Sequence, residues 1–541
     1  MVAYKGSVVS SWNIWSVPVG IISLIIISPV LAIFYSALLG DTTLWPHLFS
    51  TVLPRYLLNT LLLMLGVGSL SLVFGISTAW LVSRYEFPGR SIFEWALLLP
   101  AAVPAYIIAY TYTDLLEYAG PVQGYLREIF NWQNSQDYWF PNIRSLEGAV
   151  LVMSSVLYPY VYLLTRASFI TLPISYFQTS AIYGRKPFYA VALPLARPAI
   201  IAGLALVLME TISDFGTVDY FAIETLTLGV FNVWLGMNSL SGAAQISSIL
   251  FFIVVILLTL ELIARRNHRF YEKHSRQESQ DLEEISNFQK ILFFITCLIP
   301  LILGFIIPVS VLINFVLKGY AVVNISEVVD TAITSISISF VASTTIMLLS
   351  FIMVVVATYK SNTFQKTLIF LASCGYAFPG TILAVGVVVF VGWLNDIFYF
   401  RMSYFIGGFV ILIFAYTLRF LAIGNGSIRS GVTRINPNLI DASRTMGRSF
   451  LTTMKKVILP LTYTNILVGG ILVFVDILKE LPITLLLRPF NFETLATYVY
   501  QYASDEMLEE SSFAALIIIL AGLGPVIFLS RTIKKYSTKT N

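Results

Sequence analysis

This sequence of 541 residues contains few charged residues. Asp, Glu, Lys and Arg make up 11% of it, whereas soluble domains average about 25%. Hydrophobic residues make up 57%, and the mean hydropathy is +0.81. This composition excludes an ordinary soluble enzyme and a disordered chain, and it indicates a protein whose surface mostly faces lipid. The small net charge of +4 gives no sign of a nucleic-acid partner.

Residues that carry catalysis or bind metals are also scarce. The two cysteines, Cys297 and Cys374, lie inside apolar runs, which excludes a disulfide scaffold and predicts packing roles. The three histidines, His47, His268 and His274, are too scattered to predict a metal cluster. The sequence contains no phosphate-binding GxxxxGK[ST] motif and no Ser/His/Asp arrangement. We therefore expect no enzymatic activity, no cofactor and no tightly bound metal in this chain.

Long apolar runs recur along the whole sequence, and each is near the length of roughly 20 residues that a membrane-spanning helix needs. They predict an all-α integral membrane protein with about twelve spans. The first run is longer than the apolar core of a signal peptide, so we expect it to be retained. The predicted spans are 15–39, 57–83, 92–114, 147–165, 198–216, 244–264, 291–316, 331–358, 367–393, 402–423, 463–479 and 512–531.

The distribution of Lys and Arg predicts the orientation. In a twelve-span arrangement the basic loops all fall on one side and the acidic loops on the other, so we expect the basic side, with both termini, to be cytoplasmic. The basic segments are 84–91, 166–197, 419–456 and the tail from Arg531. The acidic segments contain Asp214, Asp219 and Glu224, and Asp505, Glu506, Glu509 and Glu510.

The chain resembles itself on either side of a charged stretch. Residues 265–290 are dense in both signs of charge and predict a solvated cytoplasmic linker. LLLPAAVPAYIIA around Pro104 matches SCGYAFPGTILAV around Pro379, and ALPLARPAI matches ILPLTYTNI further along. We therefore predict two units of about six spans, residues 1–264 and 291–541. An even number of spans in each unit makes the repeat parallel, with pseudo-twofold symmetry about the membrane normal.

Four carboxylates follow the same register in the two units. Glu210 and Asp214 are four residues apart, which places them on one face of a continuous helix, and Asp476 and Glu480 repeat the spacing. An ionised carboxylate at mid-membrane costs roughly 2.5 kcal/mol or more, so such residues usually face the interior or a wet cavity. We interpret the four as candidates for lining a transport pathway.

Two further points stay open in the sequence. The carboxylates could instead be solvated at the ends of their spans, or paired with Lys479 and Arg488. Tyr106 and Tyr110 share a helix face after Pro104, and we expect them to be core or interface residues.

The loop DASRTMGRSFLTTMKKVILP, from Asp441 to Pro460, predicts a short helix, a turn at Gly447 and a second amphipathic stretch. Its spacing resembles the EAA loop of ABC-importer permeases: Glu-Ala-Ala, three residues, Gly, and later Leu-Pro. The first unit matches less well, because ten residues separate Gly184 from Pro194 where thirteen separate Gly447 from Pro460. In that family the loop inserts into a cytoplasmic ATPase. The residues at the matching positions are Gln178, Thr179, Ser180, Gly184, Leu193 and Pro194, and Asp441, Ala442, Ser443, Gly447, Leu459 and Pro460.

Other segments resemble one branch of this family. VDILKELPITLLLRPFNFETLATYVYQYASDE (475–506) and METISDFGTVDYF (209–221) are similar to ferric-iron importer permeases with two fused units. The resemblance implies two tandem six-helix type I (MetI-like) permease units in a bacterial inner membrane. It also implies two copies of a cytoplasmic ATPase that holds ATP and Mg²⁺, an extracytoplasmic iron-binding protein, and Fe³⁺ as the transported substrate.

Other functions remain open. The same machinery could carry thiamine, a polyamine, an oxyanion or another small solute. A secondary transporter driven by an ion gradient would need no ATPase-docking loops, and it should place its charged residues nearer mid-span. If the protein were a membrane scaffold, the free-energy cost of placing paired carboxylates in the membrane would have no explanation.

Overall fold

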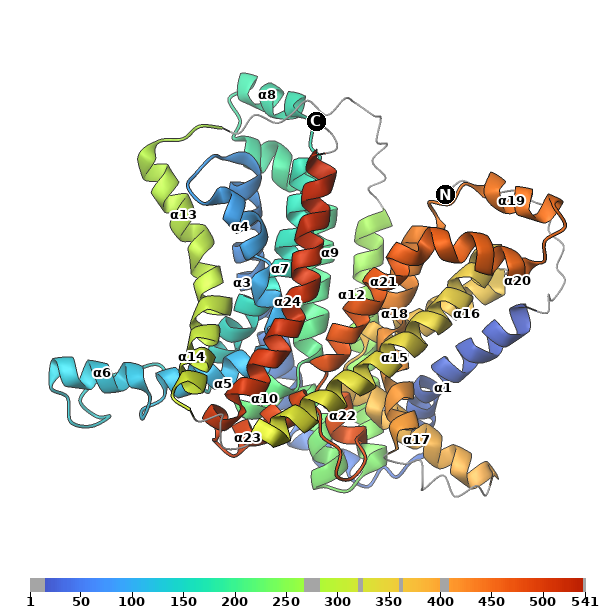
Figure 1. Cartoon of the computed structure of the whole chain (residues 1–541). Coiled ribbons are helices and arrows are strands. Elements are labelled where there is room, and N and C mark those ends of the chain that lie inside the picture. Colours follow the sequence, from blue (N-terminus) through green and yellow to red (C-terminus); the bar gives the residue numbers. More distant parts are fainter. Residues whose placement is uncertain (1–14, 267–282, 320–324, 360–362, 399–407, 539–541) are drawn as a thin grey trace.

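The computed structural model describes residues 15–266, 283–319, 325–359, 363–398 and 408–538, and these residues form helices throughout (Figure 1). The helices before the linker are α1 (Ser16–Leu39), α2 (Trp45–Ser50), α3 (Leu53–Arg84), α4 (Arg90–Ala96), η1 (Leu99–Ala102), α5 (Ala105–Leu116), α6 (Pro121–Phe130), α7 (Leu146–Ile170), α8 (Ile174–Ile182), η2 (Phe188–Ala192), α9 (Leu193–Ser213), α10 (Gly216–Tyr220), α11 (Leu226–Phe231), η3 (Asn232–Gly236) and α12 (Leu240–Arg266). Those after it are α13 (Asn287–Leu301), η4 (Ile302–Ile306), α14 (Ile307–Leu317), α15 (Ile325–Tyr359), α16 (Thr363–Ala372), η6 (Ser373–Ala377), α17 (Gly380–Phe398), α18 (Phe409–Val432), α19 (Pro437–Thr445), α20 (Phe450–Thr453), η8 (Met454–Ile458), α21 (Leu459–Leu478), α22 (Pro482–Leu487), α23 (Leu495–Ser504) and α24 (Leu508–Thr538).

Within these described ranges, eleven helices are long and apolar enough to cross a membrane, or twelve if one sharply bent pair counts as a single span. This confirms the predicted all-helical membrane architecture. The bent pair is the predicted span 92–114, which turns by 91° between residues 102 and 105. Pro104 at the bend has an extended backbone (ψ 139°), because proline cannot continue the helical hydrogen-bond ladder. The predicted span 367–393 is likewise interrupted before Pro379, between η6 and α17.

The internal repeat is visible in matching tertiary hydrogen bonds. The amide of Leu226 donates to the hydroxyl of Thr60 on α3 (3.0 Å), and the amide of Leu495 donates to the hydroxyl of Ser335 on α15 (2.7 Å). The threonine before each of these leucines caps the helix that follows, α11 or α23. Each half therefore builds the same helix start against its own long span.

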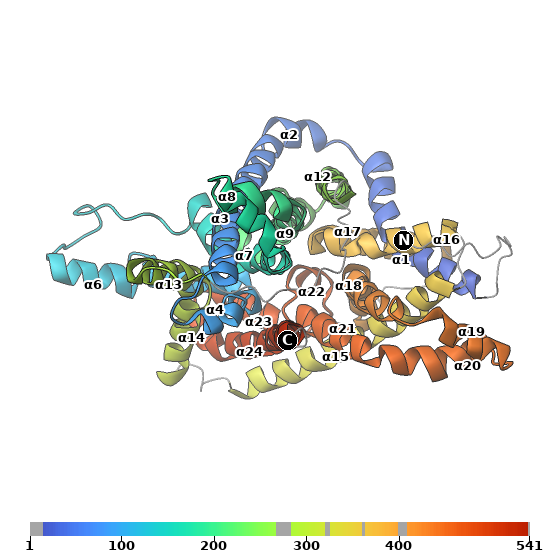
Figure 2. The ribbon, with the colours of Figure 1, turned by 90° about the horizontal axis from the view of Figure 1, so that it is seen from above.

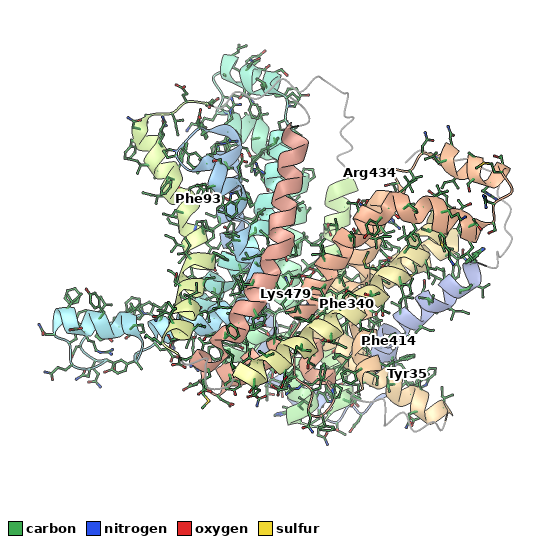
Figure 3. All side chains as sticks on the ribbon, viewed as in Figure 1. Tyr35, Phe93, Phe340, Phe414, Arg434 and Lys479 are labelled. Carbon is green, nitrogen blue, oxygen red and sulfur yellow. The ribbon has the colours of Figure 1, made fainter. Side chains whose placement is uncertain are left out.

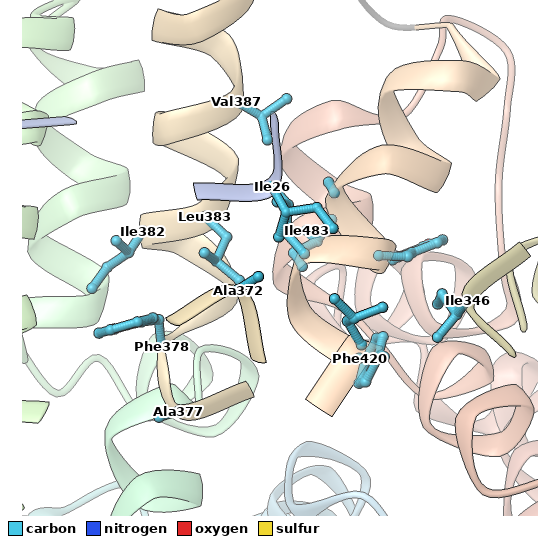
Figure 4. Packing of buried hydrophobic residues seen from close by; sticks show 14 of the residues in the cluster. Ile26, Ile346, Ala372, Ala377, Phe378, Ile382, Leu383, Val387, Phe420 and Ile483 are labelled. Carbon is cyan, nitrogen blue, oxygen red and sulfur yellow. The ribbon is translucent and has the colours of Figure 1, made fainter. Parts of the chain in front are cut away.

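The first span of each half packs against the other half. α1 contacts α16 and α17, while α13 contacts α4 and α14 contacts α5 (Figures 1 and 2). In the buried cluster, Ile26 of α1 packs beside Leu383 of α17 and Ile483 of α22 (Figure 4). The two halves are thus joined through their apolar cores as well as through the linker.

The two ends of the bundle differ. The end carrying α8 and α19, at the top of Figure 1, also carries the end of α24, and we call it the upper end. Trp15, directly before α1, packs against Phe450 of α20, which lies beside α19. The opposite, lower end carries α6, α10, α22 and α23 (Figure 1). The predicted linker 265–290 lies largely outside the described residues. Its last part docks at the upper end, where Glu283 pairs with Tyr85 along the backbone and forms an ion pair with Arg84.

Candidate functional site

Two protruding loops at the upper end share one backbone geometry. α8 ends before Gly184 and α19 ends before Gly447, and both glycines have positive φ, +64° and +74°. A side chain is strained in this left-handed region, which glycine adopts freely. After each glycine the chain turns back toward a long span, α9 or α21.

A serine at the equivalent position of each loop stabilises the turn through both its backbone and its side chain. The backbone carbonyl of Ser180 accepts from the amide of Arg185 (3.0 Å), and that of Ser443 accepts from the amide of Arg448 (3.2 Å), which is the usual closure of a helix end by glycine. Both serines are buried, and their hydroxyls bond within the loop: Ser180 donates to the carbonyl of Arg185, and Ser443 pairs with Thr453. These serines hold the turn, whereas Gln178, Thr179, Asp441 and Ala442 are exposed on the two helices.

The second loop is longer than the first, and its additional residues lie after the glycine turn. In the second loop an extra helical turn, α20, precedes the π-helical segment η8, which runs directly into Leu459 and Pro460. In the first loop the π-helical segment η2 begins directly after Pro187 and runs into Leu193 and Pro194. The three additional residues therefore lengthen the second loop beyond its glycine turn.

The tips of both loops expose apolar side chains to the surroundings of the upper end. Ile182 and Tyr183 are 83% and 76% exposed, and Met446, at the position equivalent to Tyr183, is 73% exposed. Isolated exposed apolar residues need no explanation, but matching ones on two protruding loops indicate contact surfaces.

A cavity of about 130 Å³ lies between the halves, at the lower ends of α9 and α21. Side chains from both halves line it, including Tyr106, Tyr160 and Phe215 of the first and Tyr376 and Phe420 of the second. Lys479, which directly follows the end of α21, also lines it and is labelled in Figure 3. All four predicted pathway carboxylates line this cavity, so the repeat brings them together.

Glu480 is held in a buried ion pair. It accepts from the guanidinium of Arg419 on α18 (3.0 Å) and from the amide of Ile483 (3.2 Å), and the two side chains are 5% and 9% exposed. A side chain at Gly380 would approach both charged groups within 3 Å, so glycine at the start of α17 gives this pair its space. The alternative partner considered for Glu480, Arg488, instead pairs with Glu493.

The next two carboxylates have different partners. Asp476 forms an ion pair with Lys479 (3.0 Å) on the last turn of its own helix, as one of the open alternatives proposed. Glu210 accepts a hydrogen bond from the hydroxyl of Tyr376 (2.7 Å), which belongs to the other half. Among the described residues no ion pair reaches Glu210, and its side chain lines the cavity.

Glu210 and Asp214 lie at the lower end of α9. The helix ends at Ser213, but the amide of Asp214 still donates to the carbonyl of Glu210 (2.9 Å) and its φ of −66° is helical, so the four-residue spacing extends to Asp214. The Asp214 carboxylate accepts from the amide and hydroxyl of Thr217 (2.9 and 3.1 Å), which lies in the first turn of α10. Glu480 likewise lies beyond the end of α21 at Leu478.

The two halves contribute different charged groups to the lining of the cavity. Among the described residues that line it, the first half contributes Glu210 and Asp214, and the second half contributes Asp476 and Glu480 with their cations. Both carboxylates of the second half therefore have an ion-pair partner, whereas Glu210 and Asp214 of the first half accept hydrogen bonds from uncharged groups.

Another contact joins the halves below the cavity. The hydroxyl of Tyr500 donates to the carboxylate of Asp219 (2.5 Å). Burial raises the pKa of Asp219, although this hydrogen bond opposes the rise.

Sequence reasoning missed or misplaced several residues of this site. Arg419 was counted with the basic segment 419–456, but it lies inside α18 and points into the protein. An arginine within an apolar run, with carboxylates elsewhere in the same unit, was the available signal. Tyr160 and Tyr376 had no distinguishing pattern. Tyr106 is buried and lines the cavity, while Tyr110 is a core residue.

The chain matches one protein-family profile and is similar to several known transport proteins. The profile of a family described as "Binding-protein-dependent transport system inner membrane component" matches residues 349–535. The chain is 25% identical over 504 residues to the Fe(3+)-transport system permease protein FbpB 2 of Haemophilus influenzae, covering 91% of this chain and 92% of that one. It is 20% identical to the ferric transport system permease protein FbpB of Actinobacillus pleuropneumoniae, covering 93% and 75%.

A third relative is more similar over a shorter stretch. The molybdenum transport system permease protein ModB of Haemophilus influenzae is 30% identical over 165 residues, which cover 29% of this chain and 69% of that protein. The family profile falls in the half that contains α19, Gly447 and the carboxylates Asp476 and Glu480. The chain belongs to the family of inner membrane components of binding-protein-dependent transport systems.

Proposed function

We propose that this chain is the membrane-spanning subunit of an ATP-driven importer, with both halves of the pathway in one chain, and that its substrate is ferric iron. The observation that carries the importer assignment is the pair of equivalent loops at one end of the bundle, each with an exposed helix closed by a left-handed glycine. Similarity over nine-tenths of the chain to two ferric transport permeases supports the substrate.

Two copies of a cytoplasmic ATPase would dock on α8 and α19, and the upper end would therefore be cytoplasmic. The basic loops predict the same orientation, with both termini inside. An extracytoplasmic iron-binding protein would deliver substrate at the lower end. ATP and Mg²⁺ would be held by the ATPase, and this chain would need no cofactor of its own.

The cavity between the halves would form part of the pathway. Closure of the ATPase dimer would bring the two loops together and tilt the helices that lead from them, α9 and α21, to the cavity carboxylates. Glu210 and Asp214 would supply the negative charge that a cation follows, because Asp476 and Glu480 are already neutralised. Carboxylate and phenol oxygens are hard donors, which suit Fe³⁺.

An oxyanion is the second candidate substrate. Arg419 and Lys479 line the cavity, and one relative is named a molybdenum transport permease. Both cations are bound by carboxylates, however, and four carboxylates against two cations leave the described lining negative. We therefore favour a cation.

The docking part of the proposal is tested with exposed residues whose replacement leaves the fold intact. Tyr183→Asp and Met446→Asp each place a charge on an apolar loop tip, and we expect loss of ATPase co-purification. Phe490→Asp changes an even more exposed residue in the loop after α22 and should retain the ATPase. Retention of the ATPase by both loop variants would contradict the docking assignment.

The substrate is tested separately in proteoliposomes containing the chain, its ATPase and its binding protein. We expect uptake of radiolabelled ferric iron that requires ATP and is lost in Met446→Asp. ATP-dependent uptake of molybdate without iron would retain the importer and overturn the substrate. Uptake indifferent to ATP would favour a secondary transporter.

A further inference from the structure

The first half carries a helical arm that leaves the bundle at the lower end. After the 91° bend at Pro104, α5 runs sideways through the protein, and α6 continues outward beside α14 (Figures 1 and 2). All residues of α5 from Tyr106 to Thr113 are buried, whereas α6 projects beyond the packed helices. The arm is thus anchored at its inner end and free along its outer half.

One side of α6 is apolar and uncovered. Val122, Tyr125, Leu126 and Ile129 recur at the spacing of one helix face. Tyr125 is 65% exposed and Ile129 is 52% exposed, whereas Val122 and Leu126 are partly buried, so Tyr125 and Ile129 form the uncovered part of this face.

The other side of α6 is polar and is covered by the chain that follows it. The hydroxyl of Tyr138 donates to Gln123 (2.6 Å) and accepts from Arg127 (3.0 Å), while Trp132 stacks on the ring of Tyr138. This returning segment runs below α6 in Figure 1 and to one side of it in Figure 2. The uncovered apolar face is on the opposite side of the helix from the residues that this segment covers.

The apolar face continues the lipid-facing surface of the bundle. At the adjoining end of α14, Ile313 is exposed and Leu317 is 80% exposed. The returning segment adds Trp139, also highly exposed, and tryptophan and tyrosine concentrate where a membrane meets water. A helix with one apolar face and one polar face suits that boundary.

We propose that α6 lies in the headgroup region of the lower leaflet, with Tyr125 and Ile129 in contact with lipid. This leaflet is the outer one in the orientation given above, but the assignment of lipid to this face does not depend on the substrate or the ATPase. The apolar character of the face favours lipid over a soluble partner, and lipid surrounds the helices from which the arm projects.

The experiment uses the full chain in lipid nanodiscs with spin labels on single cysteines. Cys297 and Cys374 are replaced by alanine, and Tyr125→Cys, Ile129→Cys and Glu128→Cys are labelled one at a time. Glu128 is an exposed residue on the polar side of the same helix, so it is the matched control. Each variant must elute as a single species and retain ATPase association before it is measured.

We expect collisions with oxygen, which concentrates in lipid, to exceed those with a water-soluble nickel chelate several-fold at residues 125 and 129. The ratio should be reversed at residue 128. Equal access of the nickel reagent at all three positions would overturn the proposal. So would labels at 125 and 129 that are shielded from both reagents, or shielded only after the binding protein is added, because these outcomes identify a protein partner.

Discussion

Arg419→Met removes the cation that neutralises Glu480 in the interior of the protein. The methionine side chain fills much of the same volume, so the main change is electrostatic. Glu480 keeps the hydrogen bond from the amide of Ile483 (3.2 Å) but loses the charged bond from Arg419 (3.0 Å).

The size of the effect follows from the burial of the pair, 9% and 5% exposed. Breaking a buried ion pair by removing one partner costs about 3–5 kcal/mol, because the other charge remains buried and unpaired. Glu480→Gln should cost a similar amount, since Arg419 is then left uncompensated. Arg419→Met combined with Glu480→Gln removes both charges, and we expect the double variant to recover most of the loss.

The assay is unfolding of the purified chain in mild detergent, measured for the wild type, both single variants and the double variant. Unfolding entropies of about 2.1 cal/mol/K per residue, if the whole chain unfolds together, convert 4 kcal/mol into a shift of about 3–4 °C. Arg488→Met and Glu493→Gln form the matched control, because that pair is 25% and 33% exposed. Partly exposed pairs contribute about 0–1 kcal/mol.

Two results would refute this reasoning. If each single change at the buried pair costs less than about 1 kcal/mol, as we expect for the control pair, burial does not determine the strength of the interaction. If the double variant loses the sum of the single effects, the two charges do not interact in the folded protein.

Three further predictions concern the backbone and the pathway. Ala222 has φ +53° where the equivalent residue of the second half is Asn491 (φ +57°), so Ala222→Asn should raise stability by about 0.5–1 kcal/mol; an unchanged unfolding midpoint would contradict this. Gly447→Val should weaken ATPase co-purification and Gly447→Asn should largely preserve it, because asparagine tolerates positive φ and a branched side chain does not; equal binding by the two would count against the turn. Glu210→Gln should reduce ATP-dependent iron uptake with little change in stability, since Tyr376 can still donate to the amide oxygen; undiminished uptake would remove Glu210 from the pathway.

The sequence alone determined the class and the repeat of this protein. Length and hydropathy of the apolar runs are local properties, and they predicted the all-helical membrane architecture that the structure confirms. The matching register around Pro194 and Pro460 predicted corresponding places for the paired loops and for the four carboxylates. Gly184 and Gly447 were recognisable because a helix that turns back requires positive φ, and glycine supplies it at little cost.

The partners of the carboxylates were decided only by the tertiary structure. Arg419 and Glu480 are 61 residues apart, and Tyr376 and Glu210 are 166 apart, so no local pattern pairs them. α9 ends at Ser213, directly before Asp214, and no periodicity in the sequence marks this end, because helix ends depend on the packing and capping that follow. Helical periodicity predicts which residues share a face within one element, but which charges meet across elements depends on how the two halves pack together.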